Sequence, residues 1–204
     1  IGVASRVLIQ GLFGILPDAM NDRLILRPGF PSLWDKASVA TPDLSYSFAR
    51  KGDTDTYHIS RQFKQPLRLV LQVNAKKETI REIKVNGTPA SWKRTEAANG
   101  YPNISIQVPP TPAATITIEW AGKELRTLVP KEISVAQNGK LTVEVPSEIA
   151  ITQVYDPQGI LATHSIQSTG FNARVKEAAG HHTFFLCTHQ GEMDWWQPVN
   201  VYIE

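Results

Sequence analysis

The sequence predicts a mainly β chain, folded as two antiparallel β-sandwiches that are preceded by one N-terminal helix. Three observations support this prediction. Residues 1–16 are apolar apart from Ser5, Arg6 and Gln10. From about residue 22 onward, short runs alternate between apolar and polar side chains, which is typical of half-buried strands. Turns rich in Gly, Asn and Pro separate these runs, and "LVPKE" (128–132) divides them into two groups.

The N-terminal helix is expected over Gly2–Phe13, with Pro17 and Asp18 ending it. A helix that is apolar on every side must be buried on every side, whereas a sandwich covers only one side. Gly11 and Gly14 favour close packing, because glycine inside a helix costs roughly 1 kcal/mol relative to alanine. Residues 1–19 are therefore interpreted as the terminal helix of a missing helical domain. A partner chain, or burial between the two sandwiches, are the alternatives for its cover.

The C-terminal part of this helix is expected to pack against the first sandwich. Leu8, Leu12 and Phe13 are predicted to contact strands, and Val3 or Val7 is predicted to stay open to a neighbour.

Residues 20–128 are predicted to form the first sandwich. Leu44, Tyr46 and Phe48 alternate with small residues, which is the period-two pattern of a half-buried strand. Trp120 ends another alternating run and is expected in the core. The expected strands are 23–28, 43–50, 56–63, 67–73, 80–87, 103–108 and 114–120.

Residues 129–204 are predicted to form a second, smaller sandwich of the immunoglobulin-like type. The pair Asn138-Gly139 lies between two β-rich runs and predicts a type I′ hairpin. The stretch "DPQG" (156–159) predicts a type I turn. The further expected strands are 149–155, 160–166, 171–176, 182–190 and 195–203.

The last of these strands carries two adjacent tryptophans. Its apolar residues have odd numbers, so a regular strand places Trp195 inside and Trp196 and Tyr202 outside. Pro198 donates no hydrogen bond, which predicts a sheet edge or a bulge at that point.

Composition and charge exclude several classes of partner. The formal net charge is +2 and the charged residues are scattered without a basic stripe, so a nucleic-acid partner is not expected. No apolar run reaches the ~18 residues that a membrane span needs. Cys187, the only cysteine, permits no intrachain disulfide and is expected to be a buried small residue.

The sequence assigns no catalytic residue, metal site or cofactor to this chain. Glycoside hydrolysis needs two carboxylates about 5–9.5 Å apart, and Asp18 and Asp35 look like turn residues that no spacing pairs. His181, His182 and His189 invite a metal site, but strand geometry spreads eight residues over ~26 Å. One straight strand therefore cannot bring these histidines onto one ion.

One segment resembles a known family. The stretch "GLFGILPDAMNDRLILRPGFPSLWDKASVATPDLSYSFAR" (11–50) is similar to the end of the (α/α)6 barrel in bacterial six-hairpin glycosidases, including rhamnosidase-like enzymes. In that family a Gly-rich turn ends the last barrel helix, and a strand like "LILRPGFP" (24–31) and a Trp-x-x-Ala step like Trp34–Ala37 follow. The hairpin "IKVNGTPASW" (83–92) also resembles those that such proteins carry in their C-terminal sandwich.

The resemblance implies a parent protein that acts on glycans and keeps its catalytic acid and base on a helical barrel upstream. It implies a periplasmic or extracellular location. The expected interface with the barrel comprises Val3, Val7, Gly11, Gly14 and Trp34.

The expected function is that of a non-catalytic C-terminal accessory region of a larger glycoside hydrolase, which packs against the barrel and stabilises it. Two alternatives remain open. A carbohydrate-binding module would use exposed aromatic rings, with Trp196, Tyr202 and Tyr101 as the candidates. A protein–protein interaction module would join subunits or surface partners. The glycan, the stereochemical outcome and the oligomeric state stay open.

Overall fold

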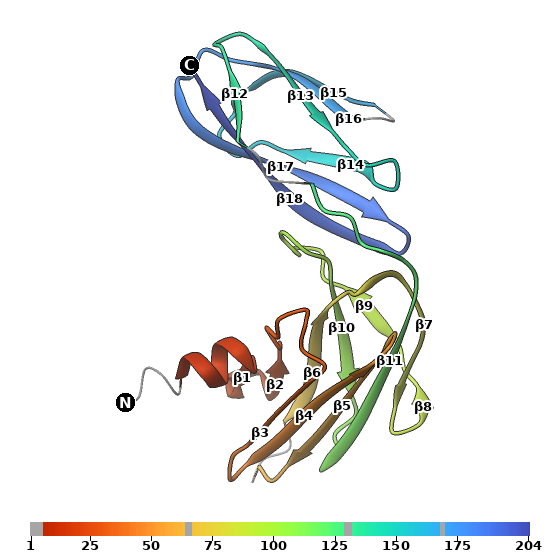
Figure 1. Cartoon of the computed structure of the whole chain (residues 1–204). Helices are drawn as coiled ribbons and strands as arrows, with labels where there is room; N and C mark the ends of the chain where they lie inside the picture. The colour runs from red at the N-terminus through yellow and green to blue at the C-terminus, as the bar shows by residue number, and fades with distance from the viewer. Residues whose placement is uncertain (1–5, 64–66, 129–131, 168–169) are drawn as a thin grey trace. The chain divides into compact units, whose positions relative to one another are not determined.

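The computed structural model describes residues 6–63, 67–128, 132–167 and 170–204, and the fold is mainly β, as the sequence predicts (Figure 1). The chain divides into two compact units. Unit 1 comprises Ile1–Arg94 and Ile104–Lys123, and unit 2 comprises Thr95–Asn103 and Glu124–Glu204. Unit 2 therefore includes a loop from the middle of the first sandwich and the segment before residue 129.

Unit 1 is a sandwich of a five-stranded and a six-stranded sheet. The five-stranded sheet has the order β1-β2-β6-β10-β9, formed by Ile15–Asp18, Arg23–Leu26, Arg68–Asn74, Asn103–Val108 and Trp92–Arg94. The six-stranded sheet has the order β3-β4-β5-β11-β7-β8, formed by Lys36–Ala40, Leu44–Lys51, Thr54–Arg61, Ala113–Glu124, Lys77–Val85 and Thr88–Pro89. β2 pairs parallel with β6, whereas the pairs β1–β2, β9–β10, β5–β11, β3–β4, β4–β5 and β7–β8 are antiparallel.

The core of unit 1 follows from the period-two pattern of its strands. Leu44, Tyr46 and Phe48 are buried, as predicted, and Trp120 is almost completely buried. The two sheets contribute apolar side chains from alternate positions, among them Leu24, Leu26, Leu69, Leu71, Ile104 and Ile106 from one sheet and Tyr57, Ile59, Ile116 and Ile118 from the other.

The N-terminal helix differs from the expected one. Its described part, η1 (Val7–Leu12), is a π-helix, and Phe13 N donates to Leu8 O at 3.1 Å, the i→i−5 bond of that geometry. The chain then enters β1, so Pro17 and Asp18 lie in a strand and not in a terminating turn. β1 is an edge strand, where the missing N–H of a proline is tolerated. A short 3₁₀ helix, η2 (Ala19–Asn21), joins β1 to β2.

Unit 2 contains a sandwich of a four-stranded and a three-stranded sheet. The first has the order β12-β18-β17-β14, formed by Ile133–Val135, Met193–Ile203, Gly180–Gln190 and Ala150–Tyr155. The second has the order β13-β16-β15, formed by Lys140–Glu144, Gly170–Val175 and Leu161–Gln167. Lettered A to G in chain order, the sheets are A-G-F-C and B-E-D, which is an immunoglobulin-like arrangement with the first strand on the sheet of C, F and G.

The prediction of a type I′ hairpin at Asn138-Gly139 is wrong. The turn itself forms, since Gly139 N donates to Ala136 O at 2.8 Å. However, β12 pairs parallel with β18, and β13 pairs with β16 in the other sheet. The turn therefore carries the chain across the sandwich. By contrast, Asn86-Gly87 joins the paired strands β7 and β8 as a two-residue turn with positive φ at both positions, the geometry of type I′.

Strand β18 follows the predicted parity. Trp195, Val199, Val201 and Ile203 are buried, whereas Trp196 is half-buried and Tyr202 is exposed. No bulge interrupts its pairing with β17, and β12 covers only Val201–Ile203. Pro198 therefore lies where β12 does not pair with β18.

Two buried glutamines on this sheet hold the chain segment that enters unit 2. Leu128 N donates to Gln197 Oε1 at 2.6 Å, and Arg126 N donates to Gln190 Oε1 at 2.9 Å. Gln190 Nε2 in turn donates to Glu124 O at 3.0 Å. Leu128 is buried, and Gln197 supplies the partner that its backbone N–H requires away from a strand ladder.

Candidate functional site

Large apolar side chains lie exposed near the start of unit 1. On η1, Val7 is 65% exposed and Leu8 is 49% exposed. In the loop between β2 and β3, Leu33 is 90% exposed and Trp34 is 41% exposed. We call these four residues the N-terminal apolar surface. An exposed group of this kind normally marks an interaction site.

Ring contacts connect the two parts of this surface and anchor them to the core. Trp34 stacks on Phe30 at 6.3 Å between centroids, and Phe30 meets Phe13 edge to face at 5.4 Å. Phe13 directly follows η1 and is buried, as predicted, against Tyr46 of β4. Gly29 N also donates to Leu12 O at 2.9 Å, which fixes the loop to the end of the helix.

The predicted interface residues of the helix have different surroundings. Val3 lies outside the described residues. Val7 is open, as predicted, but Leu8 is half-exposed and not packed under the sandwich as expected. The side chain that packs into the core at this end of unit 1 is Phe13, the residue directly after η1. Gly11 is exposed, and a Cβ there would meet only Val7 Cγ1 at 4.0 Å.

The backbone around Gly14 requires a glycine at this position. It has a φ of +62°, and a Cβ would come within 1.8 Å of Arg27 O. Its backbone pairs with β2, since Arg27 N donates to Gly14 O at 2.9 Å. The close packing that its sequence position indicates is therefore satisfied inside unit 1.

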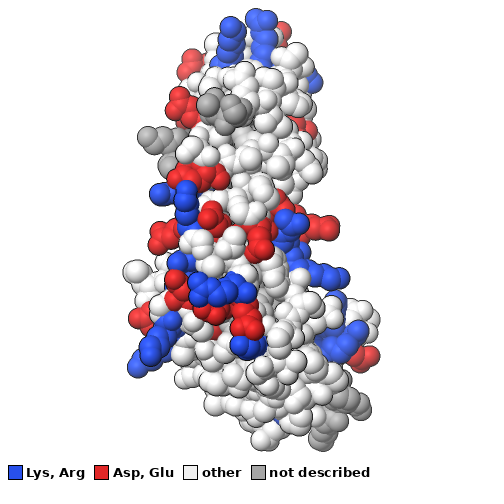
Figure 2. All heavy atoms as spheres, turned by 90° about the vertical axis from the view of Figure 1, so that its right-hand side faces the viewer, with Lys and Arg blue, Asp and Glu red and all other residues white. Residues whose placement is uncertain are grey.

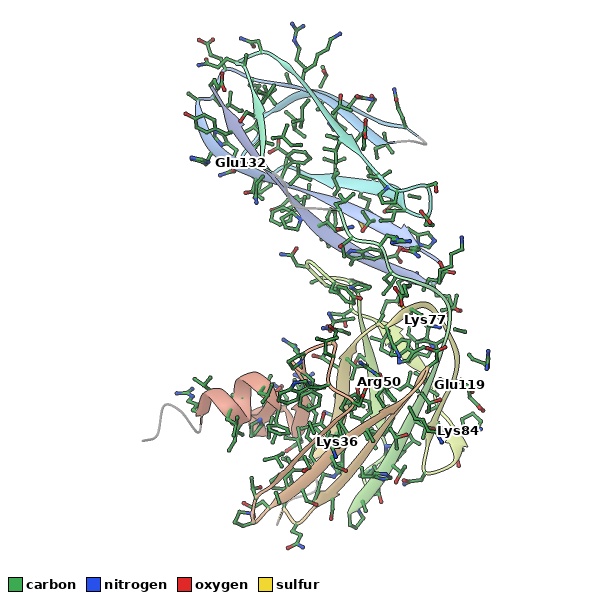
Figure 3. The ribbon with its side chains drawn as sticks, viewed as in Figure 1. Lys36, Arg50, Lys77, Lys84, Glu119 and Glu132 are labelled. Carbon is green, nitrogen blue, oxygen red and sulfur yellow. The ribbon has the colours of Figure 1, made fainter. Side chains whose placement is uncertain are left out.

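A buried ion pair supports the loop that carries Trp34. Asp55 accepts from Arg50 Nε at 2.6 Å, from Arg50 Nη2 at 2.9 Å and from Trp120 Nε1 at 3.0 Å. Arg50, labelled in Figure 3, also donates from Nη1 to Ser32 O at 3.2 Å and from its backbone N to Asp35 O at 2.7 Å. The hydrogen bond with Asp55 raises the pKa of Arg50. Both oxygens of the Asp55 carboxylate accept hydrogen bonds, which offsets part of the cost of burying its charge.

Asp18 and Asp35 are the two carboxylates considered for catalysis. Asp18 accepts from Arg23 Nη2 at 2.6 Å and from Asn21 Nδ2 at 2.8 Å, and these bonds lower the pKa of its carboxyl. A general acid needs the opposite shift. Asp35 is an exposed loop residue.

The histidines considered for a metal site each have a different partner. His181 Nδ1 lies 2.6 Å from Glu132 Oε1, and His189 Nδ1 lies 2.7 Å from Asp194 Oδ1. His182 Nε2 lies 2.9 Å from Ala178 O. Within the described ranges, no group of three or more His, Cys, Asp or Glu side chains could hold a metal ion.

Charged side chains of both signs are interleaved on the face shown in Figure 2. Ion pairs link Lys77 to Asp53 at 2.6 Å and Arg81 to Glu119 at 2.5 Å. Lys77, Lys84 and Glu119 mark the same β7–β11 region in Figure 3. Opposite charges at this spacing cancel one another's field at longer range. In addition, none of the helices among the described residues is long and apolar enough to cross a bilayer.

The three aromatic candidates for sugar binding lie in unit 2 but do not form one group. Trp196 and Tyr202 share the outer face of β18, and the ring of Tyr202 lies tilted against that of His181 at 4.7 Å between ring centroids. Tyr101 is a half-buried residue of the Thr95–Asn103 loop. The rings that do lie beside Trp196 belong to other strands. Tyr155 meets it at 6.3 Å, and Phe185 meets Tyr155 at 6.2 Å.

No family model matches the chain, and no curated protein sequence matches it. Among solved structures, the chain is similar to the tandem Ig repeats of Dlar, with 9% sequence identity and a TM-score of 0.28. The match covers 83% of this chain and 97% of that chain. The immunoglobulin-like description of unit 2 follows from its strand order.

Proposed function

We propose that this chain is a non-catalytic accessory region of a larger, exported glycosidase-like protein, and that it packs against a helical domain through the N-terminal apolar surface. The observation that carries the proposal is the exposure of Val7, Leu8, Leu33 and Trp34, joined through Phe30 and Phe13 to the core. Leaving such side chains in water costs roughly 25 cal/mol per Å² of apolar area that a neighbour could cover.

Two further features support a helical neighbour. A Cβ at Gly11 would meet only Val7 Cγ1 at 4.0 Å, so the side-chain position of Gly11 is open and another backbone can approach η1 closely there. The resemblance of residues 11–50 to the junction after an (α/α)6 barrel points to the same kind of neighbour. The alternative role, an interaction module for a separate protein, would use the same surface. The two roles differ in whether the partner domain belongs to the same polypeptide or to another one.

The test uses the chain alone and the protein expressed from a reading frame extended upstream. We expect Leu8→Asp to leave the melting temperature of the chain alone almost unchanged, because Leu8 is half-exposed there. In the longer protein, the same variant should lower the first melting transition by several degrees, because an unpaired charge would be buried at the contact. Scanning calorimetry measures both.

Ile166→Asp is the matched control, since Ile166 is 42% exposed and lies on β15 of unit 2. It should have the same small effect in both proteins. A reading frame without an upstream helical domain would overturn the proposal. An equal response of the two proteins to Leu8→Asp would overturn it as well.

A further inference from the structure

The outer face of the four-stranded sheet of unit 2 carries a cluster of three aromatic rings. Residues directly opposite each other on paired strands share a face. Phe185 of β17 lies opposite Tyr155 of β14 and Pro198 of β18, and the next row contains Gln153, Cys187 and Trp196. We call Tyr155, Phe185 and Trp196 the aromatic cluster.

The rings of the aromatic cluster lie close together and reach solvent. Tyr155 is 57% exposed, and Phe185 and Trp196 are half-buried. The centroid of Tyr155 lies 6.2 Å from that of Phe185 and 6.3 Å from that of Trp196. Cys187 faces the same side yet is buried, because its neighbours cover it. The cluster therefore forms a continuous apolar surface with its largest exposed part at Tyr155.

Trp196 is held in place on both sides. On one side, β18 pairs with β17. On the other side, Trp196 N donates to Ala98 O at 2.8 Å, and Gly100 N donates to Trp196 O at 2.7 Å. These bonds belong to the Thr95–Asn103 loop, which is part of unit 2. A ring with a fixed backbone loses little freedom when a ligand binds, and this raises affinity.

Polar side chains border the rings. Gln153 is exposed in the same row as Trp196. In the next row, His189 Nδ1 lies 2.7 Å from Asp194 Oδ1. A carboxylate has about four acceptor positions and an amide both donates and accepts, so these groups can bind hydroxyls beside the rings. Gln153 is uncharged and Asp194 is acidic, so neither side chain attracts an anionic ligand.

We propose that the aromatic cluster, with Gln153 and Asp194 at its border, is a binding site for a neutral saccharide. The C–H face of a sugar ring packs against an aromatic face, and its hydroxyls need donors and acceptors at the ring edge. A protein partner fits less well. A stable protein interface buries about 800 Å² per partner. Three partly covered rings supply much less, since a fully buried aromatic side chain contributes about 150–250 Å².

The test is affinity electrophoresis of the full chain in gels that contain one soluble polysaccharide each. Hydroxyethylcellulose, arabinoxylan, galactomannan and amylopectin are the neutral probes, and polygalacturonate is the acidic probe. We expect at least one neutral probe to retard the wild-type chain. Trp196→Ala and Tyr155→Ala should each abolish that retardation.

Tyr202→Ala is the matched control, because Tyr202 is an exposed aromatic on the same strand outside the cluster. It should be retarded like the wild type. Circular dichroism melting confirms that each variant is folded, and Tyr155→Ala keeps the test decisive if Trp196→Ala proves unstable. No retardation of the wild type by any neutral probe would overturn the proposal. Retardation by polygalacturonate alone would overturn it as well, as would retardation of both cluster variants to the same extent as the wild type. This proposal is independent of the one for the N-terminal apolar surface, which Leu8→Asp tests.

Discussion

Trp195→Ala will unfold unit 2 or destabilise it severely. Trp195 is completely buried on the inner face of β18, where truncation of a large aromatic side chain costs about 3–5 kcal/mol. For a unit of this size, each 1 kcal/mol shifts the melting temperature by roughly 4–8 °C, so we expect a fall of at least about 12 °C. Urea unfolding followed by circular dichroism measures the loss in free energy of unfolding, and thermal melting measures the fall in melting temperature.

The neighbouring tryptophan provides the control for this result. Trp196 is half-buried on the opposite face of the same strand, so Trp196→Ala should cost much less than Trp195→Ala. If the two variants were equally stable, or if Trp196→Ala were the more damaging, the assignment of inner and outer faces of β18 would be wrong.

Asp55→Ala will have the largest effect on unit 1. Asp55 is 1% exposed and accepts hydrogen bonds from both Arg50 and Trp120. Removing one partner of a buried ion pair leaves an uncompensated charge, which costs about 3–5 kcal/mol. Because Arg50 also binds Ser32 O, the loop that carries Trp34 should become more mobile. Thermal melting measures the loss of stability, and hydrogen–deuterium exchange of the loop amides between β2 and β3 measures the mobility.

Asp53→Ala is the matched control for Asp55→Ala. Asp53 lies two positions earlier and pairs with Lys77 at 2.6 Å, but in an exposed setting. Ion pairs exposed to solvent contribute little, so its melting temperature should stay close to that of the wild type. Equal destabilisation by the two variants would show that burial of the Arg50–Asp55 pair is not what stabilises unit 1.

The sequence predicted those features that depend on local periodicity. The alternation in β4 and the parity of β18 placed Tyr46 and Trp195 in the core, because residues two apart in a strand share a face. Two edge strands of unit 1, β1 and β3, escaped prediction. β1 contains Pro17, and β3 alternates between small or exposed side chains, so neither has the apolar period of a central strand.

Features that depend on register across the sheet could not be predicted. The Asn138-Gly139 turn has the local chemistry of a hairpin, but the strands on either side find partners far away in the chain. Likewise, Asp55 meets Trp120, and Tyr155 meets Trp196, only because the strand pairing brings them together. The sequence identified Trp196 as a candidate but gave no signal for Tyr155 or Phe185.

Hydrogen–deuterium exchange of the Val7–Leu12 amides tests the central claim most directly, since it reports whether a neighbour covers η1. The chain alone should exchange these amides quickly, because η1 is short and contains no buried residue. In the protein expressed with its upstream region, the same amides should exchange at least about tenfold more slowly, while β13 and β16 of unit 2 stay unchanged. Equal exchange of Val7–Leu12 in the two proteins would contradict the account.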